Sequence, residues 1–289
     1  MNEKEILFLY SLYEPEDGNL EGTKHRFFAN PPKIDALHEE LHSQLAFLFS
    51  KFKQFCDDNE IDYFLMGGSC IGAIRQGGIV PWDVDGDVGM LRKDYVRFKE
   101  LVQDSDYIEL IERPTIININ DVRTCFLKKK VAIKGTSHTA SIDIIVWDRV
   151  DIDEGYSVKS FWNISEGYKT ETPLTDEDDV AEFVKNLPSK FLEDYGSEDG
   201  NYLIWGIDNF KSVRAMNPVR ILPYDSVFPL DTISFLGDSY KVCNDVYNYI
   251  EQEWGDIWTI SISETYEGET QKRKIELLSN DREVINAMQ

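Results

Sequence analysis

Apolar side chains recur at steps of three and four residues in the first fifth of the chain. The positions are Ile34, Leu37, Leu41, Leu45, Leu48, Phe52 and Phe55. This spacing places them along one stripe of an α-helix, because a helix turns once every 3.6 residues. Pro31-Pro32 before the stripe and Asp57-Asp58-Asn59 after it are typical helix boundaries. The pattern therefore predicts one long amphipathic helix that packs against the rest of the fold.

Apolar and β-branched runs of strand length occupy much of the chain after this helix. They lie at 63–66, 107–111, 115–119, 122–127, 131–133 and 140–147. A helical pattern intervenes at 93–103, and further helices are predicted at 180–187, 202–210 and 242–254. Helices and strands are thus both expected, and the predicted fold class is α+β.

Three carboxylates alternate with small residues in a segment that we predict to be a strand. Asp83, Asp85 and Asp87 would share one face of it, because side chains alternate across a strand. Carboxylates this close repel one another and need a cation to stay ionised. Hard oxygen ligands of this kind suit Mg²⁺, with Mn²⁺ as the alternative. An acidic edge strand exposed to water is the structural alternative.

A glycine turn stands shortly before these carboxylates. Gly67-Gly68 breaks the preceding strand where the backbone must turn tightly or approach a ligand closely. Ser69 is a fair N-cap for a short helix from Cys70 to Arg75. Backbone N–H groups at a helix N-terminus hold phosphate, and Arg75 would add a fork of donors. The combination favours phosphate binding beside a metal ion.

A further acid, Asp143, interrupts the apolar run from Ala140 to Trp147. An acid inside a buried strand is costly unless it is paired or binds a metal ion. Asp143 is therefore a candidate for the same site, whereas Asp148, at the end of the run, is expected to cap a turn.

One motif indicates different chemistry. His38-Glu39-Glu40-Leu41-His42 fits H-E-x-x-H, in which two histidines one helical turn apart bind zinc and the glutamate acts as base. These histidines lie beside the apolar stripe, as boundary residues do, and only His25 and His138 remain as histidine third ligands. A zinc metalloprotease is kept as a remote alternative.

The chain of 289 residues carries a formal net charge of -23, which would repel nucleic acid and anionic lipid. No nucleic-acid partner is therefore expected. Lys128-Lys129-Lys130 is the densest positive run, predicted as a solvated turn or as a weak phosphate-steering element. No apolar run reaches membrane-spanning length and no signal peptide is recognised, so we expect no transmembrane segment and a cytoplasmic location.

The chain resembles the LicD family of the nucleotidyltransferase superfold in the stretch GGSCIGAIRQGGIVPWDVDGD, from Gly67 to Asp87, and in the following Arg92-Lys93-Asp94-Tyr95. That family includes bacterial phosphocholine transferases and fukutin-type sugar phosphotransferases. Phe228-Pro229-Leu230 and Trp254-Gly255-Asp256 look like its closing segment. Gln76 stands where the family usually has histidine, a departure that bears on the substrate.

This resemblance implies a nucleotidyltransferase-like mixed sheet flanked by helices, with a helical and loop-rich C-terminal region. A chain of this length exceeds the usual single-domain size. We divide it into an N-terminal arm (1–33), a nucleotidyltransferase-like catalytic core (34–150), a C-terminal substrate- or donor-binding region (151–260) and a peripheral helix or tail (261–289).

The resemblance also implies roles for single residues. Asp85, Asp87 and Asp143 are expected to be the catalytic metal ligands, with Asp143 as the third carboxylate from a neighbouring strand. Trp82 would receive a quaternary ammonium group by cation–π contact, and Asp83 would orient the ligands or act as a base for the acceptor. The full set expected to bind the donor is Gly67, Gly68, Ser69, Arg75, Trp82, Asp83 and Lys241.

The function implied is transfer of a phospho-alcohol, such as phosphocholine, from a CDP-linked donor to a hydroxyl of a cell-surface glycan or glycolipid. The alternative is a nucleotidyltransferase that adds a nucleotide to a small molecule or protein and releases pyrophosphate. A non-catalytic binding protein joins the zinc metalloprotease as a remote alternative.

Overall fold

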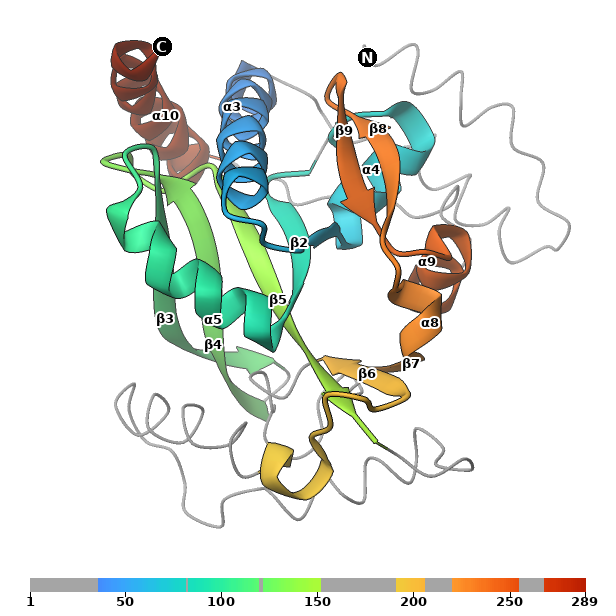
Figure 1. The fold of residues 1–289 in the computed structure, drawn as a ribbon. Helices are drawn as coiled ribbons and strands as arrows, with labels where there is room; N and C mark the ends of the chain where they lie inside the picture. Colours follow the sequence, from blue (N-terminus) through green and yellow to red (C-terminus); the bar gives the residue numbers. More distant parts are fainter. Residues whose placement is uncertain (1–35, 82, 120–121, 152–190, 206–219, 255–267) are drawn as a thin grey trace, which may run out of the picture.

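The structure, a computed structural model, describes residues 36–81, 83–119, 122–151, 191–205, 220–254 and 268–289 (Figure 1). The predictions for 1–33 and 152–187 lie outside the described residues.

One mixed sheet of seven strands organises the described part of the chain. Its strands are β1 (Phe64–Leu65), β2 (Gly86–Leu91), β3 (Ile108–Ile119), β4 (Val122–Ile133), β5 (Ser141–Val150), β6 (Tyr202–Trp205) and β7 (Arg220–Pro223). The order is β1-β2-β5-β4-β3, and β6 pairs with β5 and with β7. Strands β2 and β5 run parallel, whereas the other described pairs in this sheet are antiparallel. The predicted α+β class with a mixed sheet is confirmed.

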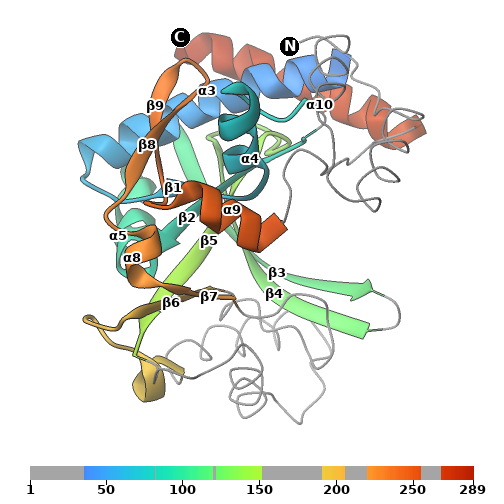
Figure 2. The same cartoon turned by 90° about the vertical axis from the view of Figure 1, so that its right-hand side faces the viewer.

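Helices and a small hairpin pack against part of this sheet (Figure 1, Figure 2). The helices are α3 (Ala36–Asp58), α4 (Gly67–Gln76), α5 (Arg92–Leu101), the 3-10 helix η1 (Val102–Asp104), α8 (Tyr224–Val227), α9 (Val246–Trp254) and α10 (Gly268–Met288). The hairpin consists of β8 (Asp231–Phe235) and β9 (Asp238–Val242). It lies against α4, where the Leu236 N–H donates to the Gly77 carbonyl at 2.8 Å.

Helix α3 is the long helix that the apolar spacing predicts. Its stripe faces the sheet, and Leu41, Leu45 and Phe52 are at most 2% exposed. Helix α10 lies beside it, since Gln44 Nε2 donates to the Leu278 carbonyl at 2.7 Å (Figure 2). The charged segment near the C-terminus therefore forms a helix that packs on α3.

Some local predictions are wrong. The helix predicted at 202–210 is instead strand β6 over Tyr202–Trp205, because its aromatic and β-branched residues pair with strands on both sides. The separate strand runs between 107 and 133 form two strands of 12 residues each. Pro114 is tolerated inside β3 because this strand lies at the edge of the described sheet. Lys128-Lys129-Lys130 lies within β4, so the solvated turn predicted there does not exist.

Candidate active site

The two parallel strands bring Asp87 and Asp143 together. Asp87 in β2 and Asp143 in β5 are register partners, so their side chains leave the same face of the sheet at neighbouring positions. Strand β2 begins only at Gly86, so it is shorter than predicted. Asp83 and Asp85 precede this strand, so the prediction that one strand carries all three acids is wrong.

The N-terminus of α4 is built onto these acids. The Gly68 N–H donates to Asp87 Oδ2 at 3.2 Å. A Cβ atom on Gly67 would lie 2.6 Å from Asp87 Oδ2, and one on Gly68 would lie 2.0 Å from Asp83 Oδ2. Gly67 also has a φ of +47°, which favours glycine. The glycine pair is therefore needed because two carboxylates press against the backbone.

Ser69 is not the N-cap that the sequence predicts. Helix α4 begins at Gly67, with Met66 at the N-cap position. The Ser69 hydroxyl instead accepts the N–H of Asp87 at 2.9 Å. Ser69 thus ties the first turn of α4 to the start of β2.

Asp87 lies in an environment that disfavours its charge. Burial raises the pKa of this carboxyl well above its ordinary value, and the carboxylates of Asp85, Asp83 and Asp143 raise it further. The hydrogen bond from Gly68 lowers the same pKa but does not reverse the shift. A cluster of like charges of this kind is relieved by a bound cation.

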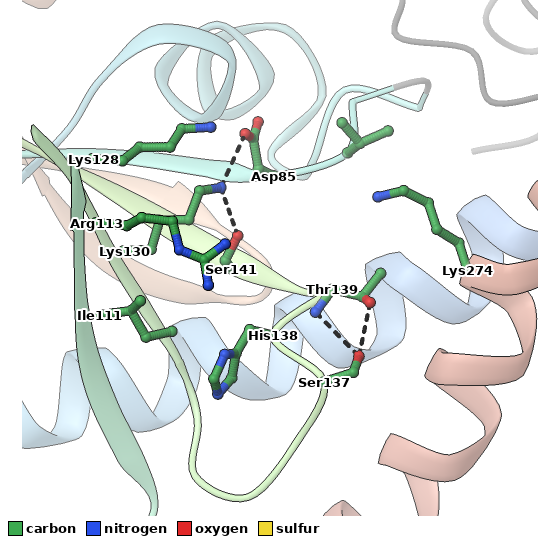
Figure 3. Close-up of a pocket in the computed structure, with 11 residues that line it drawn as sticks. Asp85, Ile111, Arg113, Lys128, Lys130, Ser137, His138, Thr139, Ser141 and Lys274 are labelled. Atoms are coloured by element: carbon green, nitrogen blue, oxygen red, sulfur yellow. Dashed lines mark hydrogen bonds and ion pairs between the residues drawn. The ribbon is translucent and has the colours of Figure 1, made fainter. Parts of the chain in front are cut away.

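Lys130, which the sequence predicted to lie in a turn, brings a positive charge to this aspartate cluster. Lys130 lies opposite Asp143 across β4 and β5, and its Nζ is 2.8 Å from Asp143 Oδ1 and 3.9 Å from Asp85 Oδ2. It also donates to Ser141 Oγ at 2.9 Å (Figure 3). Burial lowers the Lys130 pKa, but the aspartates outweigh this effect and leave it raised. Lys130 is therefore an ammonium counterion to two of the predicted metal ligands.

Asp83 is held by its own loop and by α3. It is 6% exposed, and its Oδ1 accepts the N–H of Val84 at 3.0 Å. Its backbone carbonyl accepts a hydrogen bond from His42 Nε2 on α3 at 2.8 Å. Burial lowers the pKa of His42, while this hydrogen bond opposes the effect. One histidine of the H-E-x-x-H motif therefore positions the loop that carries Asp83.

The zinc reading finds no site in the described part of the chain. No group of three histidine, cysteine, aspartate or glutamate side chains there is arranged to hold a metal ion as the side chains stand. His38 and His42 contact each other edge to face at 6.3 Å between ring centroids. His138 lies 3.1 Å from a carboxylate oxygen of Glu109, and His25 lies outside the described residues.

Two further predicted donor-binding residues, Arg75 and Lys241, lie on α4 and on β9. Arg75 lies in the last turn of α4, where burial lowers its pKa to about 10. Lys241 on β9 donates to Asp62 Oδ1 at 2.6 Å and lies over the Tyr63 ring at 5.9 Å. Trp82 lies outside the described residues. The donor-binding roles of these three residues stay predictions.

A pocket of ≈ 530 Å³ opens beside Asp85 (Figure 3). It lies between β3, β4, the turn before β5 and helix α10. Its lining is rich in basic side chains, namely Arg113, Lys128, Lys130, His138 and Lys274. No single sequence motif predicts this group, because its members come from β3, β4, the turn before β5 and α10.

Comparisons with known proteins found one family model and two relatives that match part of the chain. Residues 60–176 match the family model described as "LicD/FKTN/FKRP, nucleotidyltransferase domain". The lipopolysaccharide cholinephosphotransferase LicD of Haemophilus influenzae is 48% identical over 50 residues, which cover 17% of this chain and 19% of that protein. An uncharacterised protein of Rickettsia typhi is 36% identical over 44 residues, which cover 15% of this chain and 14% of that protein. Each match thus spans less than one fifth of the relative's length.

Strands β1 to β5, the helix that opens on Asp87 and the aspartates on neighbouring strands all lie within the matched stretch. Residues 60–176 match a domain of the LicD family, which confirms the resemblance seen in the sequence. None of the described helices is both long and apolar enough to cross a membrane. The cytoplasmic location stays a prediction.

Proposed function

We propose that this protein is a metal-dependent transferase that moves a phospho-alcohol from a CDP-linked donor to a hydroxyl of a cell-surface glycan or glycolipid. The observation that supports this most directly is the pairing of Asp87 with Asp143 on parallel strands, with α4 opening on Asp87. The name of the Haemophilus relative, lipopolysaccharide cholinephosphotransferase, suggests choline as the alcohol.

The residues present suit a divalent cation. Asp87 lies among carboxylates that raise its pKa, and carboxylate oxygens are the ligands that Mg²⁺ takes. As the side chains stand, no three acids of the described residues are arranged to hold a metal ion. Asp85, Asp87 and Asp143 would hold Mg²⁺ or Mn²⁺ after Lys130 releases Asp143. The bound ion would neutralise the donor's phosphates during transfer.

The chain's own groups have separate tasks in the proposed reaction. The glycine pair lets the first turn of α4 approach Asp87 closely, and Ser69 fixes the Asp87 backbone. Arg75, on the same helix, would bind a donor phosphate. The Asp83 carboxylate accepts a hydrogen bond from the Val84 N–H, and its carbonyl accepts one from His42. These bonds suit a residue that positions the ligands.

The transfer itself balances as a displacement at phosphorus. The acceptor hydroxyl oxygen forms a bond to the phosphorus of the phospho-alcohol, and the bond from that phosphorus to the oxygen of CMP breaks. CMP leaves, and the hydroxyl proton passes to a carboxylate of the aspartate cluster. The protein contributes positioning and charge rather than a covalent intermediate.

Nucleotide addition is the second candidate, because the matched family model is described as a nucleotidyltransferase domain. The same aspartates would serve it, but the donor would be a nucleoside triphosphate and pyrophosphate would leave. Donor preference therefore separates the two reactions.

The test is a calorimetric titration of CDP-choline, CDP-ribitol and CTP into the full chain, with and without Mg²⁺. We expect one CDP-alcohol to bind only with Mg²⁺, and Asp87→Asn to abolish both that binding and turnover, because it removes a ligand charge. Asp106→Asn, at an exposed aspartate before β3, is the matched control and should behave as wild type. Preference for CTP would favour nucleotide addition. Retained Mg²⁺-dependent binding in a folded Asp87→Asn variant would refute the site.

A further inference from the structure

The basic pocket beside Asp85 gathers positive charge in a strongly acidic chain. The chain has 53 acidic and 30 basic residues, yet Arg113, Lys128, Lys130 and Lys274 line one pocket (Figure 3). Such a concentration of one sign is unexpected for a surface that only provides solubility, because like charges repel.

The strand register makes this repulsion explicit. Arg113 on β3 stands directly opposite Lys128 on β4, and like charges at opposed positions destabilise a sheet. On the other face of the same strands, opposite charges are paired, since Glu112 stands opposite Lys129. Glu112 Oε2 also accepts a hydrogen bond from Lys99. The unfavourable pairing is therefore confined to the face that lines the pocket.

The aspartates offset part of this charge. Lys130 lies 2.8 Å and Lys128 lies 3.9 Å from oxygens of Asp143, and Asp85 itself lines the pocket. Arg113 and Lys274 add two further positive charges from other elements. The hydroxyls of Ser137 and Thr139 also line the pocket, where they are hydrogen-bonded to each other at 2.7 Å.

Helix α10 contributes Lys274, the pocket residue that is farthest from the others in the sequence. Lys274 points toward the pocket from this helix, which lies beyond the matched stretch of 60–176 (Figure 3). The helix is fixed there by Asp281, whose carboxylate accepts the Ser137 N–H at 2.7 Å. A cation from outside the matched domain therefore completes the pocket.

We propose that this pocket binds a phosphate group of the acceptor substrate. The chemistry fits a phosphate, because three lysines and an arginine line one concave site. Its place beside Asp85 brings a ligand there within reach of the aspartate cluster. The assignment to the acceptor rests on the proposed transferase function.

We assign the donor phosphates to α4 and not to this basic pocket. The glycine turn and Arg75 are the elements expected to hold the donor diphosphate, and α4 opens on Asp87. Among the described residues that line the basic pocket, none belongs to α4. Donor and acceptor phosphates would thus lie on separate sides of the aspartates.

The first experiment titrates inorganic phosphate and sn-glycerol 3-phosphate into the full chain without metal. Lys274→Gln and Arg113→Gln should each weaken binding about tenfold, because each removes a charge-assisted hydrogen bond. Arg273→Gln, which removes an exposed charge from the neighbouring position on α10, should leave the affinity unchanged. Equal affinity in wild type and both pocket variants, with each variant showing the wild-type unfolding temperature, would overturn the proposal. The two variants lie on different elements, so a folding defect in one leaves the other as the test.

The second experiment separates the two sources of phosphate. With Mg²⁺ present, saturating CDP-choline should leave the affinity for sn-glycerol 3-phosphate unchanged within twofold. Competition between the two would assign the pocket to the donor and overturn the acceptor assignment. If CDP-choline does not bind at all but phosphate binding still depends on Lys274 and Arg113, the transferase function fails while the anion pocket stands.

Discussion

Lys130 faces Asp143 across two antiparallel strands, with 2.8 Å between its Nζ and a carboxylate oxygen. In this arrangement the ammonium group occupies the position of a counterion to the predicted metal ligands. A divalent cation and Lys130 would therefore compete for the same oxygens. The pairing gives the metal assignment a test that does not depend on turnover.

Lys130→Met should tighten Mn²⁺ binding about fivefold, or ~1 kcal/mol, because the competing ammonium is gone. Isothermal titration with Mn²⁺ measures the change. Lys99→Met is the matched control, since it removes an ammonium from an exposed pair with Glu112 on the other face of the sheet. Weaker Mn²⁺ binding by Lys130→Met would mean that this lysine supports the site instead of competing for it.

His42 is the second residue whose role emerges from the fold. Its buried ring donates to the Asp83 carbonyl, and burial lowers its pKa from 6.5. The unfolded chain therefore takes up a proton on this ring at a higher pH than the folded protein does. As the pH falls below about 6.5, proton uptake favours the unfolded state and stability decreases.

His42→Phe should remove this pH dependence. The free energy of unfolding of the wild type should fall, relative to the variant, by at most about 1.4 kcal/mol per pH unit below pH ~6.5. Urea unfolding at several pH values measures the difference. Identical pH slopes in the two proteins would show that the ring does not titrate differently in the folded state.

At the level of elements, the approach of α4 to the aspartates depends on two missing side chains. Gly68 leaves space for the Asp83 carboxylate, and Gly67 leaves space for that of Asp87. Gly78, just after the same helix, has nothing within 4 Å of the position of a Cβ and lacks a positive φ. The three glycines therefore differ in what a methyl group would meet.

Gly68→Ala should lower the free energy of unfolding by about 1–3 kcal/mol and weaken Mn²⁺ binding, because the new methyl group displaces a buried carboxylate. Gly78→Ala should be neutral or slightly stabilising. Chemical denaturation and metal titration of both variants provide the comparison. Equal behaviour of the two variants would contradict the close packing of α4 on Asp83.

The elements differ in how well local sequence predicts them. Helix α3 follows from a periodic stripe whose members from Leu37 to Phe52 are buried, so pattern and structure agree. Strand β6 does not, because Tyr202–Trp205 has no alternation that excludes a helix and its pairing partners β5 and β7 are distant in sequence. Ser69 was misassigned for the same reason, since its hydroxyl serves Asp87 on a different element.

On the scale of the whole molecule, α10 joins the C-terminal end of the described chain to the central sheet. Asp281 is 4% exposed and accepts hydrogen bonds from both the N–H and the hydroxyl of Ser137. Gln44 on α3 holds the same helix through the Leu278 carbonyl. These contacts set the position from which Lys274 reaches the basic pocket.

Asp281→Ala should destabilise the protein by about 1.5–3 kcal/mol, because it leaves a buried N–H and hydroxyl without their charged acceptor. It should also weaken phosphate binding, since Lys274 loses its fixed position. Glu283→Ala, at an exposed site on α10, is the control. Thermal unfolding and phosphate titration measure both effects. Unchanged stability in Asp281→Ala would mean that α10 is held by its apolar contacts alone.

The sequence by itself determined the α+β class, the long first helix, the glycine pair beside the carboxylates and, through its resemblance, the LicD-type domain. These features are local, because each depends on the spacing of residues within one continuous stretch. The tertiary structure decided which distant side chains meet. The register of β2, β4 and β5 places Asp143 beside Asp87 and places Lys130 opposite Asp143. The packing of α10 brings Lys274 to the basic pocket that Lys130 also lines. No local pattern encodes strand register or helix docking, because both depend on the packing of the entire core.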